Sequence, residues 1–306
     1  MSPLGPSPHA DFRLSNGRPL PARLKALRLV ADRGGDLARR ALQRAAQGRR
    51  LPAMRVSYDD GRVFELPAGD EMYGPIIIIG EWEPAESRVI AAVLREGDFV
   101  VDIGANHGWY TLLMAGAVGS GGKVVAAEPC PPLWAALNHN LDLNGNPPQI
   151  DPRQLALSSE KGEVTINVFR GLPHGHASAS TLGRDDYEAF AVPADTLDAI
   201  VAGVSDRAPA LIKIDVEGAE QLVFAGGRTT LATSPMVLLE VNYETSGAFG
   251  YAPADLLGAL EPLGESVVFR VGPEGLSREL DPVGAPHGTA WLVVPEARMD
   301  RVRAIS

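Results

Sequence analysis

The chain has 306 residues, of which 45% are hydrophobic and 22% are charged. This composition is typical of a folded protein and excludes a mostly disordered one. The 38 acidic residues outnumber the 28 basic ones and give a net charge of −10. We therefore expect no nucleic-acid partner, because that binding depends largely on attraction to phosphates. The single cysteine excludes a disulfide framework within the chain.

The chain has no obvious membrane or export signal. No apolar run approaches the roughly 20 residues that cross a bilayer. The first ten residues contain three prolines and lack the apolar centre of a secretion signal. We expect a cytoplasmic protein without stable membrane insertion.

Residues 1–50 are predicted to form a basic N-terminal arm, helical or partly disordered. Between Ala22 and Arg50 there are nine basic and two acidic residues, and Gly34-Gly35 separates two stretches of helical periodicity. One interpretation is an arm for an anionic partner or a membrane surface. We favour a solvated or subunit-packing arm, through which the chain could form a homo-oligomer, because its apolar stripe is thin.

Residues 51–95 are predicted to hold a small β hairpin and a lead-in helix. Met54 to Tyr58 and Arg62 to Leu66 flank Asp59-Asp60-Gly61, a turn sequence typical of hairpins. Pro84 suits the first turn of a helix that runs to about Arg95.

Residues 96–306 are predicted to form the main α/β domain. Segments typical of strands alternate with segments typical of helices, which indicates a mostly parallel sheet with helices on both faces. Val164 to Phe169 is expected to add a strand. Ser266 to Val271 and Thr289 to Val294 are expected to pair as an antiparallel C-terminal hairpin at the sheet edge. The alternating segments are 99–103, 109–117, 123–127, 131–143, 211–215, 219–225, 236–241 and 253–260.

A glycine-containing turn follows the first of these strands. Asp102, Gly104, Asn106 and Gly108 form the pattern D-x-G-x-N-x-G, whereas a dehydrogenase would need G-x-G-x-x-G to receive a pyrophosphate. An acid at this turn would repel pyrophosphate and attract an ammonium group, such as that of S-adenosylmethionine. Glu128 ends the next strand, where its oxygens could accept hydrogen bonds from ribose hydroxyls. The alternative is an ordinary β-turn-α connection with incidental acids.

Four motifs together resemble the FkbM family of S-adenosylmethionine-dependent methyltransferases. They are Val101 to Thr111, Glu128-Pro129 with Leu137 and Asn140, Ala156 to Ser158, and Ile212 to Glu220. The resemblance implies a class I methyltransferase (Rossmann-like) fold and, usually, methylation of a hydroxyl on a sugar, polyketide or other secondary metabolite. It also implies S-adenosylmethionine as cofactor. The cofactor-binding residues implied are Asp102, Gly104, Ala105, Asn106, Gly108, Tyr110, Glu128, Pro129 and Ala156. His107 stands where the family is commonly aliphatic.

The acceptor side offers three carboxylates and a histidine as catalytic candidates. Asp215 and Glu240 end neighbouring predicted strands, so Asp215, with Glu217 nearby, could take the proton of an acceptor hydroxyl. The three carboxylates could instead hold a divalent ion that acidifies this hydroxyl. Glu217 could instead belong to a helix-capping box with Glu220. His176 lies in a polar loop that could cover the acceptor or simply be solvated.

Other polar residues have simpler interpretations. Lys213 is expected to be an ion-pair partner of the acids, and Cys130 a packing residue. No spacing predicts a histidine-built metal site. We expect an O-methyltransferase acting on a small-molecule acceptor. The alternatives are N-methylation of an amine and a binding protein that keeps the cofactor fold without transfer.

Overall fold

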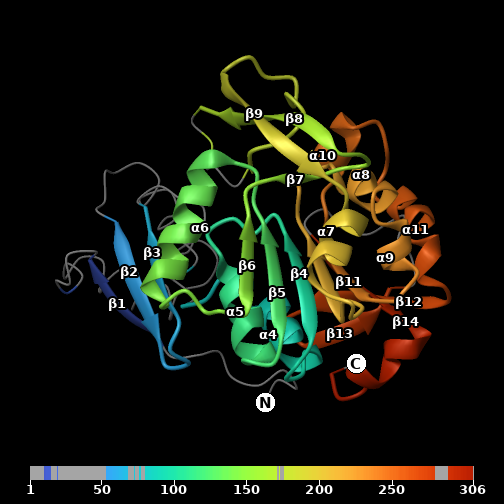
Figure 1. Ribbon diagram of the computed structural model, residues 1–306, viewed down its shortest axis with the longest axis horizontal. Coiled ribbons are helices and arrows are strands. Elements are labelled where there is room, and N and C mark those ends of the chain that lie inside the picture. Colours follow the sequence, from blue (N-terminus) through green and yellow to red (C-terminus); the bar gives the residue numbers. More distant parts are fainter. Residues whose placement is uncertain are drawn as a thin grey trace.

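The computed structural model describes residues 10–14, 19, 53–67, 72, 76, 80–170, 172, 176–279 and 289–305. These residues form one eight-stranded sheet and two three-stranded sheets (Figure 1). The helical segments expected within residues 22–50, and His174 of the polar loop, lie outside the described residues.

The eight-stranded sheet is parallel through five neighbouring strands, as the alternating sequence predicts. These strands are β11 (Met236–Val241), β10 (Leu211–Ile214), β4 (Phe99–Ile103), β5 (Lys123–Ala127) and β6 (Ile150–Arg153). Because the chain crosses from β4 to β5 on one side and places β10 on the other, the strand order reverses at β4. Ligands of open α/β sheets bind beside such a reversal.

Helices cover both faces of this sheet. Val100 packs into the core on one face and Val101 into the core on the other, as the alternation of side chains in a strand requires. The first face is covered by α4 (Pro84–Val93), α5 (Trp109–Val118) and α6 (Pro131–Leu143). The second face is covered by α7 (Leu197–Val204), α8 (Glu220–Ala225), α9 (Arg228–Leu231) and α11 (Asp255–Ala259). A short helix, α10 (Tyr243–Ala248), follows β11.

The C-terminal edge of the sheet is antiparallel, which confirms the expected pairing. Strand β14 (Thr289–Pro295) lies between β11 and β12 (Ser266–Gly272) and is antiparallel to both. A short strand that the sequence analysis did not expect, β13 (Gly275–Arg278), pairs with the outer side of β12. Two 3-10 helices, Glu261–Leu263 and Glu296–Arg301, flank this region.

A three-stranded N-terminal sheet packs beside α6 (Figure 1). Its strands β2 (Met54–Tyr58) and β3 (Val63–Leu66) form the predicted hairpin. No strand was predicted within residues 1–50, but β1 (Ala10–Leu14) pairs antiparallel with β2. The reason is burial, since alternate residues Ala10 and Phe12 are each only 6% exposed in the main hydrophobic core.

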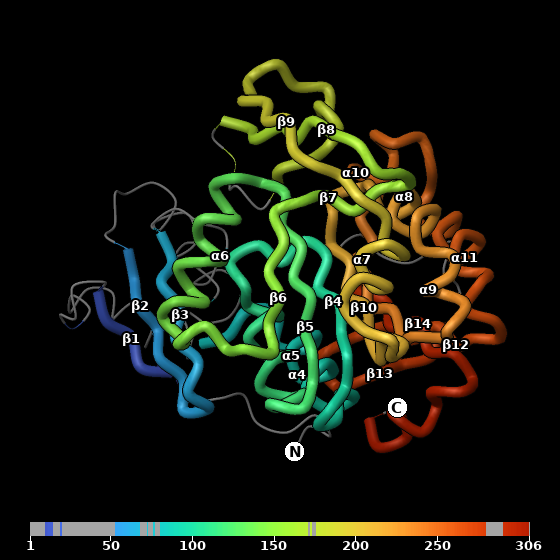
Figure 2. The backbone as a smooth tube through the Cα atoms, viewed as in Figure 1, coloured from blue at the N-terminus to red at the C-terminus, as the bar shows by residue number. Residues whose placement is uncertain are grey.

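A third sheet lies above the carboxyl ends of the parallel strands (Figure 2). It contains the expected strand, β8 (Gly162–Phe169), together with β9 (Tyr187–Asp195) and β7 (Ala156–Leu157), in the order β7-β9-β8. Within the described residues, no helix combines the length and the hydrophobicity that a bilayer crossing requires.

Candidate functional site

The turn after β4 lies in close contact with the segment after β10. Gly104 has a φ of 80°, and a Cβ atom there would lie 1.8 Å from the carbonyl oxygen of Asp215. Only glycine allows this approach. The backbone N–H groups of Gly104 and Ala105 both donate to the carbonyl oxygen of Ala127, at 2.9 and 3.0 Å. The turn is therefore held between β10 and β5.

The second half of the turn is supported by α6. Gly108, with a φ of 85°, precedes α5, and a Cβ atom there would lie 2.7 Å from Cδ1 of Leu137. Nδ2 of the buried Asn140 donates to the carbonyl oxygen of His107 at 2.9 Å. The His107 ring is itself buried, with Nδ1 2.5 Å from Oδ1 of Asn106. These contacts give the turn a defined shape.

Asp102 lies beneath the turn and is fully buried. Thr111 Oγ1 donates to its Oδ2 at 2.6 Å, and Oδ1 has no hydrogen-bond partner among the described residues. Burial raises the pKa of Asp102, while Lys213 and Thr111 act in the opposite direction. Asp102 is not among the residues that line the main pocket. Its contact with the ammonium group of a cofactor therefore stays a prediction.

Glu128 lies at the end of β5 and connects the turn to the start of α6. Its Oε2 accepts the backbone N–H of Asn106 at 2.8 Å, and its Oε1 accepts that of Cys130 at 2.9 Å. Burial raises the pKa of Glu128 to about 7, although both backbone N–H groups lower it. Each carboxylate oxygen keeps a second lone pair with which it can accept a ligand hydroxyl.

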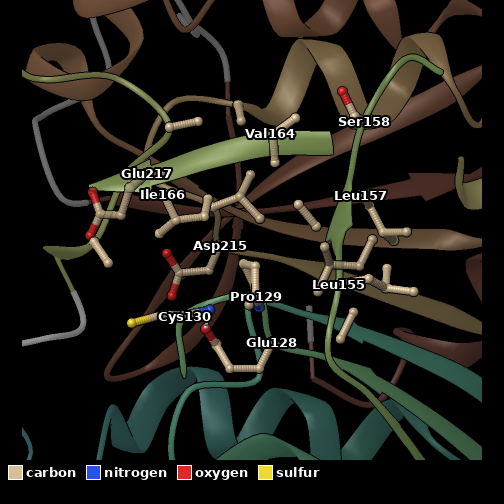
Figure 3. A pocket seen from close by; sticks show the side chains of 18 of the residues that line it. Glu128, Pro129, Cys130, Leu155, Leu157, Ser158, Val164, Ile166, Asp215 and Glu217 are labelled. Carbon is tan, nitrogen blue, oxygen red and sulfur yellow. Dashed lines mark hydrogen bonds between the residues drawn. The ribbon is translucent and has the colours of Figure 1, made fainter. Parts of the chain in front are cut away.

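These elements enclose a pocket of about 780 Å³, the main pocket, which is open to solvent. Figure 3 shows Val164 and Ile166 of β8 on one side and Glu128, Pro129 and Cys130 on the other. Its remaining walls are largely apolar. Of the predicted cofactor residues, Gly104, Asn106, Glu128, Pro129 and Ala156 line it. Ala105 and Gly108 belong to the turn and do not line the main pocket. Tyr110 lines a neighbouring cavity.

Asp215 lines both the main pocket and a second, neighbouring cavity. It follows β10, which pairs parallel with β4 as the sequence analysis required for this placement. Its carboxylate points into the main pocket (Figure 3) and also lines a neighbouring side cavity of about 390 Å³. Lys213 Nζ lies 3.1 Å from its Oδ2, which confirms the predicted ion pair. Although burial lowers the pKa of Lys213, the carboxylates of Asp215, Asp102 and Glu83 raise it overall, so the amine stays charged.

Glu217 lines the main pocket, and its backbone has a left-handed φ of 50°. Its Oε2 lies 3.5 Å from Nδ2 of Asn242 and its Oε1 lies 3.8 Å from Nδ1 of His176. In the suggested capping box, Glu220 would accept the backbone N–H of Glu217. In the structure it accepts the backbone N–H of Gly218 instead. The His176 side chain is 46% exposed and lies outside both pocket linings.

Glu240 lines the side cavity, not the main pocket. Two further acids there, Glu83 and Glu86, were not among the predicted site residues. Both stand at the start of α4, where acids are common because the helix dipole favours them, so their sequence signal was weak. Glu83 does not cap the helix with its side chain, and it instead accepts a hydrogen bond from the Tyr110 hydroxyl.

Cys130 is buried beside the main pocket, and burial raises the pKa of its thiol to about 12. A thiol in this state packs as a small apolar group and is a poor nucleophile, in agreement with the sequence interpretation. Among the described residues there is no group of three or more side chains that could hold a metal ion.

The protein has a parallel sheet with a pocket where the strand order reverses. A glycine turn follows one central strand and an acid follows the next. These features define a Rossmann-like cofactor-binding protein. The FkbM methyltransferase domain matches residues 102–270, which is more than half of the chain. The chain therefore belongs to the FkbM methyltransferase family, and its fold is the class I methyltransferase fold.

Two curated relatives share part of this region. Hexuronic acid methyltransferase AglP of Haloferax volcanii is 25% identical over 51% of this chain and 60% of its own length. Methyltransferase sdnD of Sordaria araneosa is 35% identical over 27% of this chain and 31% of its own length. The aligned parts thus span less than two thirds of either relative. The methyltransferase FkbM structure from Methylobacillus flagellatus KT has a TM-score of 0.43 and 17% identity, covering 64% of this chain and 43% of that one.

S-adenosylmethionine is the cofactor of this family, and the residues of the main pocket fit it. The pocket combines apolar walls, suited to an adenine ring, with a buried carboxylate at Glu128, suited to ribose hydroxyls.

Proposed function

We propose that the protein is an S-adenosylmethionine-dependent O-methyltransferase whose acceptor is a hydroxyl of a small molecule. The observation that carries this proposal is the position of Asp215, whose carboxylate belongs to both the main pocket and the side cavity. A group in this position can act on an acceptor in one space while the cofactor occupies the other. A sugar or other secondary metabolite is the proposed acceptor class, which agrees with the name of the relative AglP.

The protein's own residues have distinct parts in this proposal. When bound, S-adenosylmethionine supplies an activated methyl group on a positively charged sulfur. Glu128 and the turn at Gly104 and Asn106 hold it, and the apolar walls of the main pocket contact it. Asp215 orients the acceptor hydroxyl and takes its proton, while Lys213 holds the carboxylate through Oδ2. Approximation of the two reactants supplies most of the rate acceleration.

The first test is detection of the product. The protein is incubated with methyl-labelled S-adenosylmethionine and a metabolite extract of its host, and the labelled compound is identified by mass spectrometry. A label on oxygen supports the proposal, and a label on nitrogen favours the N-methyltransferase alternative. If the cofactor binds in calorimetry and no labelled product forms from any fraction, the protein is a binding protein of this fold.

The second test is Asp215→Asn, which keeps the shape and removes the charge. With the identified acceptor, turnover should fall about 100-fold, the usual contribution of a general base, while affinity for S-adenosylmethionine changes little. Because the variant leaves the buried Lys213 without its partner, stability will also fall. The double variant Lys213→Met with Asp215→Asn should recover stability without recovering turnover. Wild-type turnover in Asp215→Asn would show that Asp215 is only structural.

A further inference from the structure

The side cavity adjoins the main pocket through Asp215 and has its own composition. Its volume is about 390 Å³, including space that is open to solvent. Leu238 and Ala290 provide an apolar side. Its polar side consists of Glu83, Glu86, Tyr110, Lys213, Asp215 and Glu240. If the proposed function holds, the acceptor hydroxyl lies at Asp215. The rest of the acceptor then lies in the side cavity.

The polar side has more acidic than basic side chains. It has four carboxylates and a single ammonium, that of Lys213. That ammonium is already engaged, because its Nζ pairs with Asp215 at 3.1 Å and lies 4.9 Å from the centre of the Tyr110 ring. The described lining residues thus offer no second cation to an acceptor carboxylate or phosphate, and Coulomb repulsion opposes its entry.

Burial and the crowding of acids favour the protonated forms of these carboxyls in the cavity. Burial, followed by the nearby Asp215 carboxylate, raises the pKa of Glu83 to about 7 and that of Glu240 to about 8. Burial also raises the pKa of Glu86, against the effect of Arg88. Lys213 acts in the opposite direction on Glu83 and Glu240 and does not offset the shift. A bound ammonium would favour the ionised carboxylates and pair with them.

We propose, building on the function proposed above, that the side cavity binds the acceptor through a protonated amine, with Glu83, Glu86 and Glu240 as its anchors. The protein then selects amine-bearing alcohols, such as amino sugars, over neutral and anionic ones. An ammonium nitrogen has no lone pair with which to receive a methyl group. The amine is therefore an anchor, and the neighbouring hydroxyl oxygen is the methylated atom.

Two of the three anchors precede residues 102–270, which match the family. Glu83 is the N-cap residue of α4, and Glu86 lies in the first turn of this helix. Glu240 lies within the match, at the end of β11. The cofactor site is thus built from family segments, while much of the charge of the side cavity comes from a helix that precedes them.

The test uses three probes that share a pyranose ring and differ in one group: glucosamine, glucose and glucuronate. Each is titrated into the protein saturated with S-adenosylhomocysteine, the demethylated product of the cofactor, and binding is measured by calorimetry or ligand-observed NMR. Glucosamine should bind at least tenfold more tightly than glucuronate, with glucose between them. Glu86→Gln and Glu240→Gln should each reduce the preference for glucosamine about tenfold, the worth of one charge-assisted hydrogen bond. The exposed Glu160→Gln is the control and should leave the preference unchanged.

The outcomes separate this inference from the proposed function. If S-adenosylhomocysteine binds and glucuronate binds as well as glucosamine, the charge selectivity is wrong and the cofactor assignment stands. Binding of none of the three probes to the loaded protein also overturns the inference. If S-adenosylhomocysteine and S-adenosylmethionine both fail to bind, the proposed function itself is wrong.

Discussion

Asn140 donates a hydrogen bond from Nδ2 to the carbonyl oxygen of His107 at 2.9 Å. Its Oδ1 accepts the backbone N–H of Glu65 at 2.8 Å, so one buried side chain on α6 joins the cofactor turn to strand β3. The N-terminal sheet is therefore connected to the cofactor site through α6, although it contributes no residue to the main pocket.

Replacing Asn140 tests this connection. Asn140→Ala leaves a buried carbonyl and a backbone N–H without their partner, so the free energy of unfolding should fall by about 2–4 kcal/mol. Affinity for S-adenosylmethionine should fall about tenfold, because the turn loses its support. Urea denaturation and calorimetry measure the two effects. Asn138→Ala, which removes only a bond to the carbonyl of Trp134 on the same helix, is the matched control. Unchanged affinity in a folded Asn140→Ala variant would contradict the connection.

Glu128 is predicted to hold the cofactor. Glu128→Ala removes a carboxylate that accepts two backbone N–H groups and could accept ribose hydroxyls, so affinity for S-adenosylmethionine should fall tenfold or more. Glu128→Gln keeps one acceptor oxygen, so its affinity for S-adenosylmethionine should fall less than that of Glu128→Ala. Calorimetry measures the affinity, with the exposed Glu163→Ala as control. Wild-type affinity in both Glu128 variants would remove this residue from the cofactor site.

Glu83 makes stability depend on pH in a defined direction. Burial and Asp215 raise its pKa in the folded protein from 4.5 to about 7, so the folded state holds the proton more tightly than the unfolded chain. This contribution is fully present below pH 4.5 and is lost as pH rises through 7. Glu83→Gln cannot titrate, so its free energy of unfolding should fall less between pH 5 and pH 8 than that of the wild type, by about 1–3 kcal/mol. Urea denaturation across this range measures the difference. Parallel pH profiles for the two proteins would show that Glu83 has its ordinary pKa.

The N-terminal segment is predicted to add stability without being required for cofactor binding. A chain that begins at Leu51 loses β1 and the burial of Phe12, which should lower the free energy of unfolding by about 2–4 kcal/mol. Cooperative unfolding and S-adenosylmethionine binding should remain. Thermal denaturation and calorimetry check this, and a chain beginning at His9 retains β1 for comparison. Loss of the cooperative transition would place residues before Leu51 in the indispensable core.

The local sequence was sufficient to predict the helices and strands that have a strong apolar pattern and clear residues at their ends. Strands β4, β5, β10 and β11 are short, mostly apolar segments, and Pro84 and Pro131 mark helix starts, so these elements lie where they were predicted. The edge pairing of β12 and β14 was predicted because no helix separates them. Five strands were not predicted, because they are short or half-exposed and their pairing depends on partners elsewhere in the chain. They are β1, β6, β7, β9 and β13.

The cofactor class was determined by the sequence itself, because a glycine turn and an acid after the next strand are adjacent in any parallel sheet of this order. Only the tertiary structure decided what lies on the acceptor side. Packing buried Asp102 beneath its own turn and left Asp215 at the junction of two cavities. It also brought Glu83, 132 residues before Asp215 in the chain, into the same cavity lining as Asp215. The Asp215 carboxylate there helps burial to raise the pKa of Glu83. Contacts between residues so distant in sequence follow from how helices cover a sheet, which no local pattern encodes.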